Sequence, residues 1–218
     1  MNKKNTYYKQ TGKRIIDVIL ASVLIVFFFP ICLIVAIVIT LDSQGPIFAD
    51  VPERVGERGR LFRMYKFRSM IANAHFILRN HKQFQDLYQE YKRSSFKLKK
   101  DPRITRVGKF IRKHSLDEIP QLFNVLKGDM SIVGPRAYYP DELVDQQKKY
   151  PHTKTLVKKV LSVKPGITGL WQISGRSEIN FDKRITIDAR YVDHVSFLHD
   201  LFIIAKTPWA MVSGRGAV

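Results

Sequence analysis

The sequence is poor in cysteine and in acidic residues, and both shortages limit what the protein can be. Its 218 residues include a single cysteine, Cys32, so an internal disulfide is excluded and a reducing compartment is indicated. Only 19 acidic residues stand against 37 lysines and arginines, which gives a net charge of +18 at pH 7. Such an excess requires an anionic partner, which is nucleic acid, an anionic membrane surface or a phosphorylated substrate.

Several common binding motifs are also missing. The six histidines show no ligand spacing with carboxylates or with the cysteine, so the sequence predicts no zinc site. There is no Walker-type or dinucleotide-binding glycine loop, and no recognition-helix, zinc-knuckle or aromatic-basic RNA motif. Two non-catalytic alternatives are supported by the charge: a membrane-tethered nucleic-acid-binding protein and a membrane scaffold that binds anionic lipid.

A long uncharged run from Val18 to Leu41 is the most informative feature present. About 20 apolar residues are enough to cross the hydrocarbon core of a bilayer. Basic segments flank the run on both sides, although lysine and arginine beside a membrane helix favour the cytoplasmic side. A helix that breaks at Pro30 and returns keeps both flanks inside, whereas a straight span does not. We therefore predict a re-entrant membrane helix, with an ordinary kinked span as the alternative.

The remaining sequence predicts a mainly helical fold with a few short strands. Apolar periodicity favours helices over three ranges: 72–93, 141–150 and 181–195. A basic helix or turn over 106–113 precedes a helix that starts near 115–117 and stops at Gly128. Short strands are expected over 47–51 and 60–70.

These elements predict two units along the chain. Residues 1–46 form a basic N-terminus with the re-entrant helix, and residues 47–218 form one compact cytoplasmic α/β catalytic domain with interfacial amphipathic helices. The apolar tail at 197–212 lies either in the membrane interface, where tryptophan is favoured, or in the soluble core.

Asp117 and Glu118 are the leading catalytic candidates. They follow the strongly basic stretch 97–113 and precede Pro120, and proline is tolerated in the first turn of a helix but not in its interior. Both carboxylates therefore lie at or just before a helix N-terminus, where backbone N–H groups and the helix dipole favour phosphate. One carboxylate can attack phosphorus while the other holds Mg²⁺. The spacing from Ser115 to Glu118 also fits a capping box with no catalytic role.

Further polar candidates have weaker support. Arg136 follows a Gly-Pro turn, and arginine grips phosphate with two parallel donors. A lone arginine after a turn is more often a surface residue, and the same interpretation applies to Lys66 and Arg112. For Asp188 and Asp200 the default is a salt bridge or a helix cap.

Nine short motifs follow one another from about residue 13 to the C-terminus. They are Lys13–Asp17, Leu41–Pro46, Arg54–Gly56, Lys66–Met70, Asp101–Thr105, Ser115–Gln121, Gly128–Arg136, Lys164–Gln172 and Ser174–Arg176. In this order they resemble the bacterial sugar transferases, the monotopic phosphoglycosyl transferases that begin the assembly of surface polysaccharides and glycoconjugates.

The resemblance implies a reaction and a site. Members of this family transfer a phospho-sugar from a nucleoside-diphosphate sugar, normally a UDP-sugar, to polyprenol (undecaprenyl) phosphate, and UMP leaves. Asp117 matches the family's nucleophile, and Glu118 matches the acid that assists with Mg²⁺. The phosphate-contacting arginines match Arg112 and Arg136. Further polar positions of the family match Lys66, Asp188 and Asp200. The family's proline break in a re-entrant helix matches Pro30.

The resemblance also implies a location and partners. It places the protein on the bacterial cytoplasmic membrane, with its catalytic domain on the cytoplasmic face against anionic lipid of the inner leaflet. UDP-sugar and polyprenol phosphate are the expected partners, without nucleic acid. The resemblance leaves the oligomeric state open, and the apolar tail around Trp209 is a separate indication that two subunits can pair in a homodimer. Longer members carry an additional N-terminal membrane domain, so the chain resembles the minimal catalytic form.

Three departures from the family pattern bear on sugar preference. Ala137 replaces a frequent proline, Asn73 replaces a frequent acid, and Ala49–Pro52 replaces a stretch that usually contains Arg and Gln.

Overall fold

The computed structural model describes residues 8–94, 96, 98, 100–175 and 179–212, and within them the fold is mainly helical with a few short strands, as predicted. The α-helices are α2 (Lys13–Asp42), α3 (Ala74–Asn80), α4 (Gln85–Arg93), α5 (Arg106–Lys113), α6 (Gln121–Lys127), α7 (Pro140–Lys149), α8 (Lys154–Val160), α9 (Leu170–Ile173), α10 (Phe181–Asp193) and α11 (Phe197–Val212). The short helical turns are η1 (Tyr8–Gly12), η2 (Glu57–Gly59), η3 (Lys82–Phe84), η4 (Leu116–Glu118) and η5 (Pro151–Thr153). The strands are β1 (Arg54–Val55), β2 (Leu61–Phe62), β3 (Ser131–Val133) and β4 (Gly166–Thr168).

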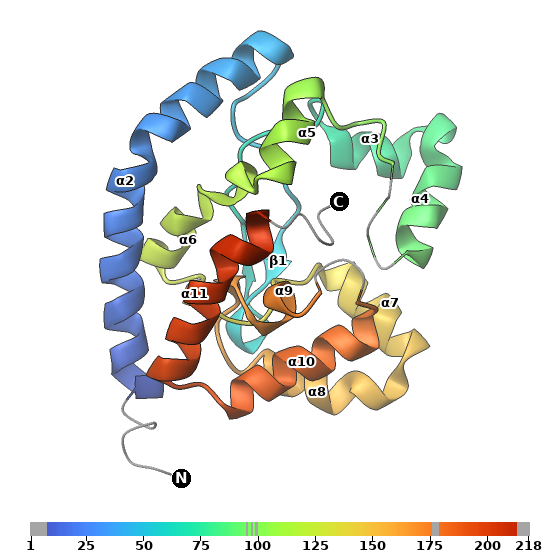
Figure 1. Cartoon of the computed structure of the whole chain (residues 1–218). Coiled ribbons are helices and arrows are strands. Elements are labelled where there is room, and N and C mark those ends of the chain that lie inside the picture. Colours follow the sequence, from blue (N-terminus) through green and yellow to red (C-terminus); the bar gives the residue numbers. More distant parts are fainter. Residues whose placement is uncertain (1–7, 95, 97, 99, 176–178, 213–218) are drawn as a thin grey trace.

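Two small sheets lie at the centre of this arrangement, with the helices around them (Figure 1). Strands β1 and β2 pair antiparallel, whereas β3 and β4 pair in parallel. Parallel strands need a long crossover connection, and α7 and α8 supply it between β3 and β4. A single bridge between Val55 and Tyr138 joins β1 to the segment after β3, so the two sheets position one another.

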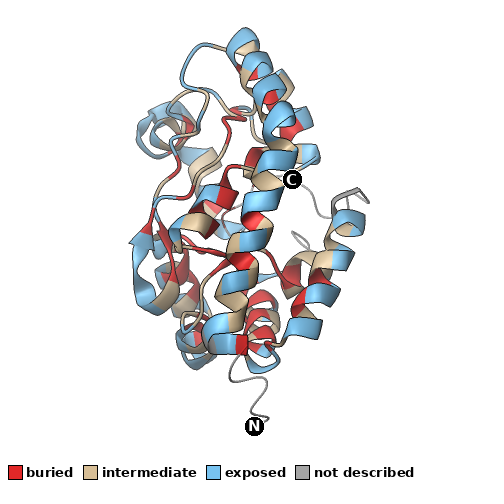
Figure 2. Ribbon diagram, turned by 90° about the vertical axis from the view of Figure 1, so that its left-hand side faces the viewer, coloured by how far each residue is buried: buried red, intermediate tan, exposed pale blue. Residues whose placement is uncertain are grey.

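The predicted membrane segment forms one helix, α2, which is long and apolar enough to cross a bilayer. Its outward face is largely exposed (Figure 2), and Val26, Phe27 and Leu41 are each more than two thirds accessible. Pro30 lies inside the helix, and the axis of α2 changes direction in its C-terminal half (Figure 1). The predicted break is thus a bend within a continuous helix, because an internal proline removes one backbone hydrogen bond without ending the others.

Both ends of α2 are attached to the same folded body. Near its N-terminal end, Arg14 donates hydrogen bonds to the carbonyl oxygens of Val125 and Leu126 at the end of α6. Beyond its C-terminal end, Arg68 donates to the side-chain and carbonyl oxygens of Ser43, each at 2.7 Å. Hydrogen bonds thus hold both ends of α2 against the rest of the fold, although most of the helix surface between them is exposed.

The main apolar core is built where α2, α6, β3, α10 and α11 meet. Its fully buried members include Ala21, Val125, Val133 and Ile203, each at 1% exposure or less. Burial of side chains of this kind contributes about 1.5–3 kcal/mol for each large aliphatic residue. The core therefore holds the strand that leads to Arg136 against the membrane helix.

The helical ranges predicted from periodicity are partly confirmed. The predicted helices at 141–150 and 181–195 correspond to α7 and α10, but the range 72–93 is divided into α3 and α4. The division falls at His81, whose backbone is extended and therefore stops α3. The predicted strand at 60–70 shrinks to β2 with isolated bridges, and 47–51 forms only one bridge at Phe48.

The capping-box interpretation of the Asp-Glu pair is wrong. Ser115 adopts a left-handed conformation (φ 54°), and among the described residues its side chain caps no helix. Asp117 and Glu118 lie in the turn η4, and the α-helix begins only after Pro120. Gly128 ends that helix at φ 87°, as predicted, because a left-handed position is adopted by glycine without strain.

The apolar tail forms α11, and its partial burial confirms the interpretation that it packs in the soluble core. Ile203 is fully buried in the core, whereas Leu198 and Trp209 are about three-quarters exposed. The helix therefore packs with one side against the fold and leaves an apolar side available to an interface.

Candidate active site

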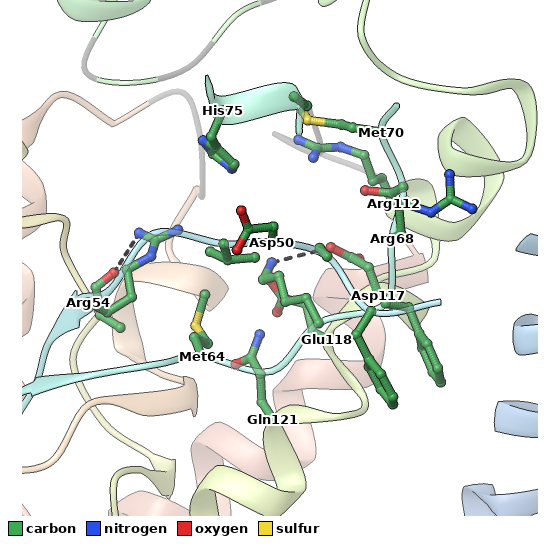
Figure 3. Close-up of a pocket in the computed structure, with 18 of the residues that line it drawn as sticks. Asp50, Arg54, Met64, Arg68, Met70, His75, Arg112, Asp117, Glu118 and Gln121 are labelled. Carbon is green, nitrogen blue, oxygen red and sulfur yellow. Dashed lines mark hydrogen bonds and ion pairs between the residues drawn. The ribbon is translucent and has the colours of Figure 1, made fainter. Parts of the chain in front are cut away.

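A cavity of about 300 Å³ lies next to η4 and collects most of the predicted site residues (Figure 3). Five of the predicted substrate-binding and catalytic side chains line the cavity. They come from four different segments, because Asp117 and Glu118 are adjacent in η4. These lining residues are Lys66, Arg112, Asp117, Glu118 and Arg136. The cavity thus brings Lys66, Arg112 and Arg136 together with the Asp-Glu pair.

Lys66 joins the two carboxylates. Its ammonium donates to Asp117 Oδ2 at 3.2 Å and to Glu118 Oε1 at 2.8 Å. Asp117 is 6% exposed, whereas the Glu118 side chain is 39% exposed. Burial lowers the pKa of Lys66, but the charges of Asp117 and Glu118 outweigh it, so the pKa is raised and the ammonium stays charged.

Backbone contacts fix this geometry. The N–H of Phe67 donates to the carbonyl oxygen of Asp117 at 3.0 Å, which aligns the residue after Lys66 with the nucleophile candidate. Thr105 caps α5 by accepting from the N–H of Gly108, and a Cβ at Gly108 would lie 1.9 Å from the carbonyl oxygen of Ser69. Only glycine permits this approach, which sets α5 and the following η4 against the segment of Lys66.

Arg136 is positioned by a buried aspartate behind the cavity. The backbone N–H of Arg136 and the hydroxyl of Tyr138 donate to Asp188 Oδ2 at 3.2 and 3.0 Å. The Arg136 guanidinium lies 5.3 Å from the ring centre of Trp171, which also lines the cavity. Burial raises the pKa of Asp188 to about 7, despite the hydrogen bonds and the arginine charges that lower it.

Asp200 is attached to a different part of the fold. It accepts hydrogen bonds from Tyr8, Lys13 and Tyr191, so it ties the start of α2 to α10 and α11. Neither Asp188 nor Asp200 is among the described residues that line the cavity. Their predicted direct contact with substrate is therefore not supported. Asp188 contacts the lining residue Arg136, whereas the three residues that donate to Asp200 do not line the cavity.

Other lining residues were not singled out as candidates from sequence. Arg54, His75, Gln121 and Trp171 all face the cavity. Arg54 and Trp171 lie within the Arg-Val-Gly and Gly-Leu-Trp-Gln motifs, which was the available signal. The pKa of His75 is lowered to about 3 by burial and by neighbouring arginines, so its imidazole is neutral.

The Asp-Glu pair fits Mg²⁺ only together with a substrate. Mg²⁺ commonly binds one or two protein carboxylates and completes its shell with phosphate oxygens and water. Among the described residues, no group of three or more His, Cys, Asp or Glu side chains forms a metal cluster. The available donors therefore suit a metal that arrives with a phosphate and not an all-protein cage.

Comparison with known proteins identifies relatives of this chain among bacterial transferases. It is 41% identical to the undecaprenyl-phosphate galactose phosphotransferase of Salmonella typhimurium and 47% identical to the galactosyl transferase CpsE of Streptococcus agalactiae. These matches cover 94% and 86% of this chain, but the chain spans only about two fifths of the length of these two relatives.

A shorter relative matches over most of its own length. The exopolysaccharide production protein ExoY of Rhizobium meliloti is 38% identical over 94% of this chain and 88% of that protein. The bacterial sugar transferase family matches residues 8–214, which include α2, the Asp-Glu pair and the loop of Arg136. The chain belongs to the bacterial sugar transferase family.

Proposed function

We propose that the protein transfers a phospho-sugar from a UDP-sugar to polyprenol phosphate and releases UMP, through an intermediate on Asp117. The observation that carries this proposal is a buried carboxylate, paired with Lys66, in a cavity that also contains Arg112 and Arg136. A carboxylate is a suitable nucleophile toward phosphorus when cations hold the phosphate and neutralise its charge. The names of the relatives, which include phosphotransferases acting on undecaprenyl phosphate, support the same chemistry.

In the first step, an oxygen of Asp117 attacks the phosphorus that carries the sugar. A bond forms between this oxygen and phosphorus, and the bond from phosphorus to the bridging oxygen of UMP breaks. The electron pair leaves with UMP, and the sugar phosphate stays on Asp117 as an acyl phosphate. Lys66 donates a hydrogen bond to the carboxylate and orients it, and Arg136 binds phosphate oxygens.

In the second step, a phosphate oxygen of the polyprenol phosphate attacks the same phosphorus. The bond between Asp117 and phosphorus breaks, and the carboxylate is regenerated as the polyprenyl-diphospho-sugar forms. The two anionic substrates thus use one small cavity in turn, which reduces the charge that it must accommodate at any moment.

Glu118 and Asp117 are the residues that would hold Mg²⁺. The metal supplies charge neutralisation on the phosphate oxygens as charge shifts toward the leaving group. Glu118 is the more exposed of the two carboxylates and can reach a phosphate bound at the mouth of the cavity. One oxygen of Asp117 would then remain available to act as the nucleophile.

The attachment of both ends of α2 to one body supports a monotopic orientation. In this proposal α2 enters and leaves the inner leaflet on the cytoplasmic side, and the catalytic domain lies against that face. Cysteine labelling of variants with a cysteine near residue 9 and another at Ser43 tests the topology. A membrane-impermeant reagent applied to intact cells should label neither position; labelling of either one contradicts the proposal.

The decisive experiment is to trap the intermediate. The purified protein is incubated with a panel of UDP-sugars and Mg²⁺ without lipid acceptor, quenched and analysed by mass spectrometry. A phospho-hexose adduct on the peptide of Asp117 is expected for the accepted sugar, and polyprenol phosphate should remove it. A non-catalytic scaffold would yield neither an adduct nor UMP with any sugar of the panel.

A further inference from the structure

Arg54 is a buried cation that has no role in the reaction steps proposed above. It extends from β1, is only 6% exposed and lines the same cavity as Asp117. None of the ion pairs between described residues includes Arg54. A buried charge without a carboxylate partner is unfavourable, so its retention in a pocket indicates an anionic ligand.

The protein contacts of Arg54 leave part of its guanidinium available. One terminal nitrogen donates to the carbonyl oxygen of Ala137 at 3.0 Å, and Cζ lies 3.3 Å from the ring centre of Tyr139. These contacts fix the orientation of the side chain. Its Nε is buried and has no hydrogen-bond partner among the described residues, although a guanidinium offers five donors.

Other cations lie close to Arg54, and the one further acid between Arg54 and Asp117 in Figure 3, Asp50, is mostly exposed and paired with Arg63. Ala137, its hydrogen-bond partner, directly follows Arg136, which also lines the cavity and also has a buried Nε without a described partner. Nearby Arg103 is neutralised by Asp101, so it adds little net charge. The lowered pKa of His75, caused first by burial and then by Arg54, is consistent with positive potential at this end of the cavity.

The position of Arg54 relative to Asp117 specifies which anion it meets. Figure 3 shows the two side chains on different sides of the pocket, with the cavity between them. In phosphoryl transfer, the attacking and leaving oxygens lie roughly in line through the reacting phosphorus. A nucleophile on one side therefore places the leaving phosphate on the other side, which is the side of Arg54.

We propose that Arg54, together with the neighbouring Arg136, forms a subsite for the phosphate monoester that faces Asp117 across the reacting phosphorus. This inference rests on the proposed function. In the first half-reaction the subsite holds the phosphate of departing UMP. In the second it holds the phosphate of the incoming polyprenol phosphate, because attack on the same phosphorus comes from the same direction. One subsite thus serves two chemically different substrates through their shared group.

The test compares ligands with and without phosphate. The detergent-solubilised full chain, its Arg54→Gln and Arg54→Lys variants and the control Arg190→Gln are titrated calorimetrically in Mg²⁺ with UMP, uridine and a short-chain polyprenyl phosphate. Arg190 is an exposed arginine of α10 that does not line the cavity. Arg54→Gln should weaken binding of UMP and of the lipid phosphate roughly tenfold or more, and leave uridine nearly unchanged.

Arg54→Lys keeps the charge but lacks the two-pronged donor geometry, so it should show an intermediate loss for both phosphates. If thermal unfolding shows that Arg54→Gln does not fold, the Arg54→Lys variant is used to test the inference instead. The inference is overturned if UMP and uridine weaken by the same factor, if only one of the two phosphates weakens, or if neither does. Failure of the unmodified protein to prefer UMP over uridine would instead refute the proposed function itself.

Discussion

Lys66 and Asp117 are 51 residues apart in sequence, yet the Lys66 ammonium lies 3.2 Å from Asp117 Oδ2 in the cavity. The same ammonium contacts Glu118, so one cation separates two carboxylates that would otherwise repel each other. Because Asp117 is buried and Lys66 is largely shielded from solvent, their attraction is stronger than it would be at the surface. The trio keeps a charged nucleophile available to a phosphate that approaches through the cavity.

Removal of the nucleophile should abolish turnover without unfolding the protein. Asp117→Asn has nearly the same volume but cannot form the acyl phosphate, so we expect the rate of UMP release to fall by about a thousandfold or more. Asp86→Asn, at an exposed position of α4, is the matched control. Near-normal turnover by Asp117→Asn, with an intact thermal transition, would disprove the assignment.

Loss of the Lys66 charge should alter the pH dependence of the reaction. In Lys66→Met the two carboxylates face each other without a cation, so one of them takes up a proton more readily. We expect turnover near pH 7 to fall roughly a hundredfold and the acidic limb of the pH–rate profile to move to higher pH. Lys66→Arg retains the charge and should shift the limb less. An unshifted profile in Lys66→Met would contradict this role for the lysine.

Removal of Mg²⁺ should stop the reaction reversibly. We expect EDTA to eliminate UMP release and added Mg²⁺ to restore it, because the carboxylate pair needs a metal that bridges to phosphate. Glu118→Gln should raise the Mg²⁺ concentration required for half-maximal rate, while UMP release stays detectable. Undiminished activity in the chelator would rule out the metal.

The close approach at Gly108 should make this position intolerant of a side chain. A Cβ there would lie 1.9 Å from the Ser69 carbonyl oxygen, so Gly108→Ala must displace α5, with an expected loss of about 3 kcal/mol of stability.

Gly59→Ala is the control for the Gly108 variant. Gly59 has open space around its Cβ position but a left-handed φ of 81°, which costs about 1 kcal/mol for alanine. Thermal unfolding of both variants measures the difference, and equal midpoints would show that α5 accommodates the methyl group freely.

Asp188 should make stability depend on pH. Its folded pKa of about 7 lies above the ordinary value of 3.8, so the folded protein binds the proton more tightly than the unfolded chain. Stability therefore falls as pH rises between these values, by up to roughly 1.4 kcal/mol per pH unit. Asp188→Asn lacks this proton equilibrium. The thermal midpoint of the variant minus that of the unmodified protein should therefore increase from pH 5 to 7 and stay constant above pH 7.

Exposed Asp193 gives the control for this pH series. The hydrogen bond and charge of Lys159 lower the pKa of Asp193, so its contribution is already complete at pH 5. Asp193→Asn should differ from the unmodified protein by a constant amount over the same range. A constant difference for Asp188→Asn as well would show that the buried carboxyl does not titrate there.

The membrane segment and the placement of the Asp-Glu pair could be predicted from the sequence because both depend on local pattern. An uncharged run of sufficient length predicts α2 whatever surrounds it. Pro120 restricts the helix start within a few residues, so it sets Asp117 and Glu118 just before α6. The division of 72–93 into two helices was missed because it depends on one extended residue, His81, within an otherwise helical pattern.

The sequence by itself determined a mainly helical, basic chain with one membrane helix and a carboxylate pair at a helix entrance, since composition, periodicity and proline act over a few residues. Only the tertiary structure decided that Lys66 meets Asp117, that Asp188 supports Arg136 from outside the cavity, and that Arg54 is buried within it. These contacts join segments 50 residues or more apart in sequence. The chain has many other lysines and arginines, and on charge alone each of them is an equally good candidate for these contacts. Packing of the core against both ends of α2 determines which of these cations lie at the cavity, because the charges in the sequence do not specify which remote segments come close in space.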